Sequence, residues 1–345
     1  MFFKTNNKNI MKRYLLICLA VAIALAASCA PKGEKIVVAY VTGWGSDVIP
    51  DVSKMTHINY AFGHVNETFD GVNIQNEERF RLIVGLKEQK PELKVLLSIG
   101  GWTSGRFSEM AATPETREAF AADCKRIIDT YGIDGVDIDW EYPTSSAAGI
   151  SSSPDDTDNY TLLMEAIRKA IGPGKLLTYA SVWNAKFIDH KAVLPTIDFV
   201  NIMAYDMRPA GLGISSALHN SELSGIASTE TALKAHLDAG IPKEKLTIGL
   251  PFYGRGSAEK YADYVNYRDI DSTRHAVCWD EKAMVPYLTD ENGEFVFNYE
   301  NARSMRLKCQ FVLDSDVLGA MYWDYGADSD EGTLRNIVAE YMLGK

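Results

Sequence analysis

The sequence predicts a closed (β/α)8 barrel, the TIM-barrel architecture, in which eight parallel strands alternate with helices around one ring. Short apolar runs typical of strands alternate with helical patterns between residues 36 and 345. The alternative, an open doubly wound sheet, needs a glycine-rich nucleotide loop after an early strand. No Gly-x-Gly-x-x-Gly or Walker pattern is present, and no internal repeat or low-complexity linker divides the chain. We therefore expect a single α/β domain.

The expected strands are short apolar runs, and they span residues 36–41, 57–62, 94–99, 135–141, 176–182, 199–205, 246–252 and 319–323. Helical patterns fill most of the gaps, with clear ones at 77–89, 114–131, 158–171, 229–239, 299–313 and 331–342. The second helix opens with Thr113 as a cap and Pro114 in its first turn, an arrangement that starts helices. Acidic residues, among them Asp158, stand near the positive end of the third. Residues 256–299 leave room for a short insertion between strand 7 and helix 7.

The charge of the chain argues against nucleic acid as a partner. The formal net charge is -11. Residues 1–28 contain four Lys or Arg and no acid, so the remaining residues stand four charges lower, at -15. Such a surface repels nucleic acid and anionic membranes. It suits a soluble, neutral substrate.

The first 28 residues are typical of a bacterial export signal. Lys12 and Arg13 precede an apolar run, 14–27, that is too short to span a bilayer comfortably. Either Met1 or Met11 starts the chain. Small residues before Cys29 resemble a lipoprotein cleavage site, which makes Cys29 the expected lipid attachment point and 29–35 a tether. We expect a membrane-anchored lipoprotein of a bacterial cell envelope, touching the membrane only through this lipid; the alternative is an ordinary secreted protein cleaved nearby.

Cysteine and histidine spacing predicts no metal site and no cofactor. Outside the leader region the cysteines are Cys124, Cys278 and Cys309, an odd number at unrelated spacings, which fits neither a disulfide framework nor zinc ligation. The six histidines are scattered. We assign none of them to catalysis.

Three carboxylates stand at period two in the fourth expected strand. Asp137, Asp139 and Glu141 share one face of it, because side chains at i, i+2 and i+4 point the same way. Burying an unpaired carboxylate costs on the order of several kcal/mol, so packing does not explain three carboxylates on one face of a strand. Neighbouring acids push their pKa values apart and leave one protonated donor beside charged partners. The alternative is a polar edge strand whose acids are solvated. A helix that ends before residue 132 and Tyr142-Pro143 directly after the strand are instead typical of an α/β fold, in which strands are covered on both faces.

Aromatic residues gather where the expected strands end, and the carboxyl ends of the strands form the active site of such barrels. Five of the six tryptophans fall at or just past a strand end, namely Trp44, Trp102, Trp140, Trp183 and Trp323. Their flat faces suit the apolar faces of sugar rings, although a single Trp is more often core. The parity of Trp140 points it away from the acids and towards the helices.

These segments resemble the chitinases of glycoside hydrolase family 18. The matching segments are Ser-Ile-Gly-Gly-Trp at 98–102, Asp-x-x-Asp-x-Asp-x-Glu at 134–141, Met-Ala-Tyr-Asp at 203–206 and Tyr-Trp at 322–323, with weaker matches at 59–62 and 251–255. They come in the order of the family and cover essentially everything after residue 35. The acidic motif is highly specific when it lies on the fourth strand of eight.

The resemblance implies a retaining, substrate-assisted mechanism in which the acetamido oxygen of the sugar attacks its own anomeric carbon. Glu141 would be the general acid and then the base for water. Asp139 would take the acetamido N–H and stabilise the oxazolinium, and Asp137 would share a proton with it, as stacked acids titrate as a coupled set. Tyr205 would hold the acetamido oxygen.

The resemblance also implies residues that bind the substrate. Asp206 would contact the bound sugar, Trp323 would form the floor under the distorted ring, Tyr40 would close the pocket and Ser98 would support Asp137. Flanking sugars would meet residues of the remaining rim, namely Met203, Trp102, Trp183 and Arg255. The family usually has a smaller residue at Trp183. Asp134 has the wrong parity for the cleft and is interpreted as structural.

Three activities fit this motif. The first is hydrolysis of β-1,4-linked N-acetylglucosamine polymers or oligomers (chitin). The second is cleavage of the chitobiose core of N-glycans by the same chemistry, and the third is a non-catalytic chitin-binding lectin, whose members lose the acid. Large chitinases insert an α+β subdomain after strand seven, and 256–299 looks too short for its full version. We therefore expect a shallower groove and a non-processive, endo-acting enzyme.

Overall fold

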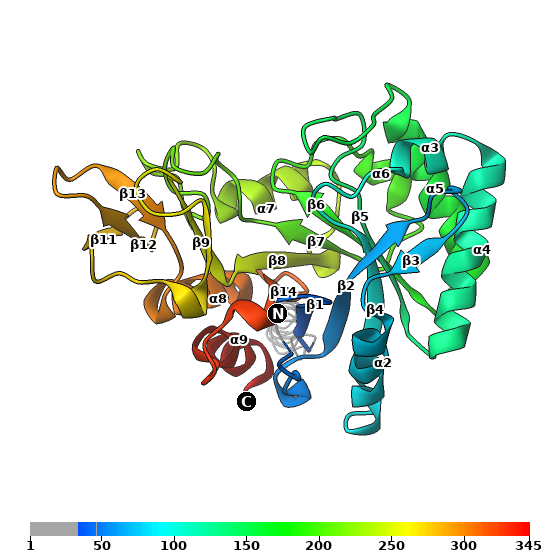
Figure 1. Cartoon of the computed structure of the whole chain (residues 1–345), viewed down its shortest axis with the longest axis horizontal. Helices are drawn as coiled ribbons and strands as arrows, with labels where there is room; N and C mark the ends of the chain where they lie inside the picture. The colour runs from blue at the N-terminus through cyan, green and yellow to red at the C-terminus, as the bar shows by residue number, and fades with distance from the viewer. Residues whose placement is uncertain (1–33, 46) are drawn as a thin grey trace, which may run out of the picture. The chain divides into compact units, whose positions relative to one another are not determined.

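Eight parallel strands close into a barrel, as the sequence predicted (Figure 1). The computed structural model describes residues 34–45 and 47–345, so the predicted leader and Cys29 lie outside the described residues. Strand β1 pairs with both its neighbours in the ring, which closes it. The barrel strands are β1 (Ile36–Thr42), β2 (His57–Val65), β4 (Lys94–Gly100), β5 (Gly135–Asp139), β6 (Leu176–Val182), β7 (Phe199–Met203), β8 (Leu246–Pro251) and β14 (Gly319–Trp323).

Helices surround this ring (Figure 1). They are α2 (Glu77–Gly85), α3 (Phe107–Ala111), α4 (Pro114–Tyr131), α5 (Asp156–Ile171), α6 (His190–Val193), α7 (Thr229–Asp238), α8 (Ala302–Asp314) and α9 (Thr333–Leu343). The predicted start of α4 is confirmed, because Thr113 accepts a hydrogen bond from the Thr116 N–H and Pro114 lies in the first turn. Helix α8 begins later than predicted, since Asn301 caps it with a reciprocal capping box. In the described part of the chain, no helix is long and apolar enough to cross a membrane.

The insertion between β8 and α8 folds as a separate antiparallel sheet. Its strands are β9 (Tyr253–Gly256), β10 (Tyr264–Asn266), β11 (Ala276–Asp280), β12 (Val285–Thr289) and β13 (Phe295–Asn298), ordered β10-β9-β13-β12-β11. A small apolar cluster, which includes Leu288, Val296 and Phe297, supports it. The insertion is therefore a small folded sheet with its own apolar cluster, and not an irregular loop.

The two faces of the barrel strands bury different chemistry. Side chains that point outward form one large apolar core with the helices, and Val136 and Ile138 of β5 belong to it. Several side chains that point inward are polar and wholly buried; these are Asn59, Ser98, Asp137, Thr178, Asn201 and Thr247. Because buried polar groups are costly unless they are hydrogen-bonded, these side chains need partners inside the barrel. Asn59 is the exception among the six, since its amide atoms have no hydrogen-bond partner among the described residues.

Three predicted strands end earlier than the sequence pattern suggested, although β8 does so by a single residue, at Pro251. Strand β5 ends at Asp139, so Glu141 lies just beyond it, and β7 ends at Met203, so Tyr205 and Asp206 also follow their strand. Asp206 adopts a positive φ of 50°, a conformation that a continuing strand does not allow. The functional side chains at these places thus belong to the first turns after the strands.

Candidate active site

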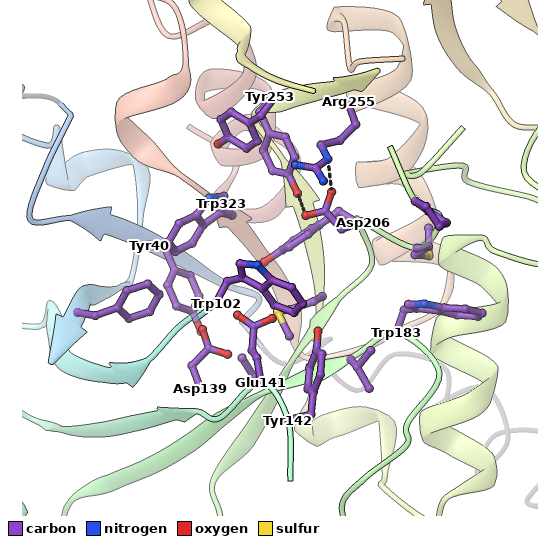
Figure 2. A pocket seen from close by; sticks show the side chains of 18 of the residues that line it. Tyr40, Trp102, Asp139, Glu141, Tyr142, Trp183, Asp206, Tyr253, Arg255 and Trp323 are labelled. Carbon is purple, nitrogen blue, oxygen red and sulfur yellow. Dashed lines mark hydrogen bonds and ion pairs between the residues drawn. The ribbon is translucent and has the colours of Figure 1, made fainter. Parts of the chain in front are cut away.

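A cavity of about 880 Å³ lies at the carboxyl ends of the barrel strands (Figure 2). Ten of the site residues predicted from sequence line it; they are Tyr40, Trp102, Asp139, Glu141, Trp183, Met203, Tyr205, Asp206, Arg255 and Trp323. Asp137 and Ser98 are not among its lining residues. Both are wholly buried in the barrel interior.

Asp137 is held by hydrogen bonds from four other strands. Its Oδ2 accepts from the Tyr40 hydroxyl and from Ser98 Oγ, both at 2.8 Å. Its Oδ1 accepts from Thr178 Oγ1 at 2.6 Å and from Asn201 Nδ2 at 3.2 Å. Burial raises the pKa of Asp137 by more than these hydrogen bonds lower it, yet each hydrogen bond favours the ionised form. The carboxylate therefore has partners for its charged form.

Asp139 and Glu141 have much poorer support for a negative charge. Burial first, and then the charges of Glu141 and Asp137, hold the pKa of Asp139 well above its usual range. Asp139 Oδ1 is buried and has no hydrogen-bond partner among the described residues. Burial, together with the charge of Asp206, raises the pKa of Glu141 to about 7. Glu141 can therefore carry a proton at neutral pH and face the cavity with it.

A second polar group follows β7. Asp206 accepts a hydrogen bond from the Tyr253 hydroxyl at 2.9 Å and forms an ion pair with Arg255, whose Nε lies 3.2 Å from Oδ1 (Figure 2). Tyr253 and Arg255 come from β9, so the insertion sheet and the barrel meet at this carboxylate. Beside it, the buried Tyr205 hydroxyl finds one hydrogen-bond acceptor among the described residues, the Met321 thioether at 3.7 Å. A thioether is a weak acceptor, which leaves that hydroxyl free to bind an acceptor on a substrate.

Aromatic rings line both sides of the acids. Trp323 stacks on Phe62, with ring centroids 5.5 Å apart and an angle of 18° between planes, and Tyr40 and Trp44 lie against it. Trp102 is 56% exposed. Such flat, partly exposed rings can stack on the apolar faces of sugars.

Two predictions made from strand parity are confirmed. Trp140 points away from the cavity and stacks on Phe107 of α3, with ring centroids 5.3 Å apart. Asp134 lies at the other end of β5, where it forms an ion pair of 2.6 Å with Lys87 and accepts from the Val95 N–H. Neither residue reaches the acids at the cavity.

Sequence reasoning missed several residues of this site. Thr178 and Asn201 are polar side chains at inward positions of otherwise apolar strands, and that parity was the signal that could have found them. Tyr142 lines the cavity directly after Glu141, although its only predicted role was to end the strand with Pro143. Tyr264 reaches the cavity from β10, and no sequence signal marked it.

The described residues contain no group of three or more His, Cys, Asp or Glu side chains that could hold a metal ion. The chemistry that the cavity offers is a carboxyl that can hold a proton near neutral pH, Glu141, beside the buried acids Asp139 and Asp137 and a tyrosine hydroxyl. That set can donate a proton to a leaving oxygen and stabilise a positive charge that develops nearby.

Comparison with known proteins points to one family. The model of the family described as glycosyl hydrolases family 18 matches residues 36–328. Chitinase A1 of Niallia circulans is 33% identical over 311 residues, which cover 75% of this chain and 44% of that protein. The chain thus spans less than half the length of this curated relative.

Solved structures give the same result over most of the chain. A family 18 N-acetylglucosaminidase from Paenibacillus barengoltzii superposes with a TM-score of 0.80 at 32% identity, covering 89% of this chain and all of that one. A Group IV chitinase of Ostrinia furnacalis gives a TM-score of 0.80 at 26% identity, covering 90% of this chain and all of that one.

Proposed function

The chain belongs to glycosyl hydrolase family 18, and from that premise we propose that it hydrolyses β-1,4 linkages between N-acetylglucosamine units of chitin or its oligomers. The placement of Glu141 carries the proposal. Its carboxyl lines the cavity, its pKa is raised to about 7, and Asp139, Tyr205 and Trp323 line the same cavity. A glycosidase acid needs this protonated state near neutral pH.

In the proposed mechanism the substrate supplies the nucleophile. Glu141 donates its proton to the glycosidic oxygen while the acetamido oxygen of the sugar attacks the anomeric carbon. Asp139 binds the acetamido N–H and offsets the positive charge of the oxazolinium. Tyr205 hydrogen-bonds the acetamido oxygen and fixes its angle. Glu141, now ionised, then takes a proton from the water that opens the ring, and the β-configuration is retained.

The remaining cavity residues are proposed to bind sugar. Trp323, backed by Phe62, forms the floor under the reacting ring, and Tyr40 closes the pocket beside it. Asp206, held by Tyr253 and Arg255, contacts the bound sugar. Met203, Trp102 and Trp183 are proposed to contact the flanking sugars. Ser98 supports Asp137 from the neighbouring strand β4.

A second activity is favoured by one comparison. A solved relative is a family 18 N-acetylglucosaminidase, so an endo-β-N-acetylglucosaminidase activity on the chitobiose core of N-glycans stands as the alternative. A lectin of this fold would lack the acid, whereas Glu141 is present. We also keep the proposals that the enzyme is non-processive and endo-acting, and that residues 1–28 direct export with lipid attachment at Cys29.

Product analysis tests the proposal. The wild-type protein is incubated in parallel with chitin oligomers and with a high-mannose glycoprotein, and the products are separated by mass. We expect short N-acetylglucosamine oligomers from the first substrate and little release of glycan from the second. The Glu141→Gln variant should lose turnover but keep sugar binding in calorimetry. If the activity of that variant stayed within tenfold of wild type, Glu141 would not be the general acid.

A further inference from the structure

Donors from four strands surround Asp137 inside the barrel. Asp137 pairs in register with Ser98 of β4 on one side and Thr178 of β6 on the other. Their hydroxyls, with that of Tyr40 and the amide of Asn201, supply two hydrogen bonds to each carboxylate oxygen. All five side chains are buried.

Asn201 differs from the other three partners in one chemical respect. A hydroxyl can rotate and accept a hydrogen bond from a protonated carboxyl, whereas an amide NH₂ group only donates. The Thr247 hydroxyl lies 2.8 Å from Asn201 Oδ1 and donates to it, which keeps Nδ2 towards Asp137. If the Asn201 amide turned by 180°, its Oδ1 would face the Asp137 carboxylate. Two acceptors would then face each other, which is unfavourable when Asp137 is ionised.

We propose that Asn201 is a positioning residue: its amide, oriented by Thr247, keeps Asp137 ionised and thereby leaves the shared proton on Asp139. The inference rests on the proposed function only for the role of Asp139 at the acetamido group. Nothing in the family motif at 134–141 includes either Asn201 or Thr247, which stand on β7 and β8.

Among the described residues, no cation pairs with Asp137 and could keep it ionised in place of Asn201. The titratable groups close enough to Asp137 to interact with it electrostatically are Tyr40 from β1, Tyr160 from α5 and Asp139 from its own strand. In the part of the chain that the structure describes, no lysine, arginine or histidine forms an ion pair with Asp137. Its negative charge is therefore held by hydrogen bonds alone. Asp139 Oδ1 has no such partner there, so the proton is better placed on Asp139.

Variants of two residues test this inference through the pH dependence of turnover. Asn201→Leu removes the obligate donor, and Thr247→Val removes only the group that orients it; Thr247→Ser keeps the hydroxyl as the matched control. On a chitin oligomer we expect Asn201→Leu to lower kcat about tenfold or more and to move the acidic limb of the kcat profile up by about one pH unit. KM should change little, Thr247→Val should shift the limb the same way by less, and Thr247→Ser should match wild type.

A purely structural role predicts a different pattern. If the variants lose activity in proportion to their loss of melting temperature, while the acidic limb stays in place in Asn201→Leu and Thr247→Val, the inference is overturned. It is also overturned if Thr247→Ser is as impaired as Thr247→Val. A second readout does not need turnover. Carbon-13 NMR of labelled aspartate carboxyls, assigned with Asp137→Asn, should show Asp137 ionised to lower pH in wild type than in Thr247→Val.

The NMR titration separates this inference from the proposed function. A wild-type protein that hydrolyses none of the N-acetylglucosamine substrates would defeat the proposed function, while the titration would still decide the role of Asn201. Identical titration of Asp137 in wild type, Thr247→Val and Asn201→Leu would defeat the inference alone.

Discussion

The Tyr40 hydroxyl on β1 donates a hydrogen bond of 2.8 Å to Asp137 on β5, across the interior of the barrel. Burial and the nearby charge of Asp137 hold the pKa of Tyr40 well above its usual value, so the hydroxyl keeps its proton and stays a donor. The first and fourth strands of the barrel, whose two residues are 97 positions apart in the sequence, thus meet at the acid beneath the cavity.

Tyr40→Phe removes this donor and should lower kcat by about 10- to 100-fold, because a hydrogen bond to a charged group contributes about 1.5–3 kcal/mol. Tyr322→Phe is the matched control. It also deletes a wholly buried hydroxyl, but that hydroxyl has no hydrogen-bond partner among the described residues. We expect Tyr322→Phe to retain activity in the same oligomer assay. Equal activities for the two variants would contradict a role for the Tyr40 hydroxyl.

The basic limb of the kcat profile should report on Glu141. The glutamate must hold its proton to act as an acid, and its pKa is raised to about 7 by burial and then by the negative charge of Asp206. Asp206→Asn removes that charge, so the pKa of Glu141 falls and the basic limb moves to lower pH. Asp263→Asn, outside the cavity, serves as the control and should leave the limb in place. A limb that moves up in Asp206→Asn would contradict the assignment.

The same glutamate should cost stability at high pH. Its usual pKa is 4.5 and its pKa in the fold is about 7. Well below pH 4.5 it is protonated in both the folded and the unfolded state. As the pH rises from 4.5 to 7, the unfolded state releases this proton while the folded state retains it, so the stability falls, and the loss is complete once the pH has passed through 7. Glu141→Gln should therefore stabilise the fold by up to about 3 kcal/mol at pH 8.

That gain should shrink towards zero as the pH falls to about 4. Melting temperatures of wild type and Glu141→Gln, measured by scanning calorimetry from pH 4 to pH 8, check the trend. A difference between the two proteins that stays constant with pH would show that Glu141 ionises as freely in the fold as in water.

The strands of the barrel could be predicted from the sequence because each is a short apolar run, and helical patterns fill most of the gaps between them. The acids Asp139 and Glu141 could be placed on one face by parity alone. Thr178 and Asn201 could not be assigned as partners of Asp137, because that requires knowing which strands neighbour β5 and in what register. Tyr264 depends on the pairing of β10 with β9, a long-range choice that local pattern does not encode.

A buried ion pair ties α8 to the segment after the insertion sheet. Lys308 and Glu300 pair with wholly buried side chains, and Lys308 also donates to the Ser216 carbonyl. Lys308→Met leaves the Glu300 charge buried and unpaired, so it should lower the free energy of unfolding by about 3–5 kcal/mol. The double variant Lys308→Met with Glu300→Leu should recover much of that loss, since an apolar pair needs no compensation.

Urea denaturation followed by circular dichroism measures both variants. Lys260→Met is the control, because Lys260 pairs with Asp290 and Glu294 at the surface of the insertion sheet and such pairs contribute about 1 kcal/mol or less. A loss for Lys308→Met no larger than that of Lys260→Met would contradict the importance of the buried pair.

In the proposed mechanism the acetamido group of the substrate is the nucleophile and Glu141 is the acid. Proton NMR of a chitin tetramer during its first minutes of hydrolysis tests it most directly, because the anomeric signals of the new reducing end distinguish the two configurations before they interconvert. We expect the β-anomer to appear first, and we expect no product from a tetramer of glucosamine, which lacks the acetamido groups. An initial α-anomer, or equal hydrolysis of the glucosamine tetramer, would contradict it.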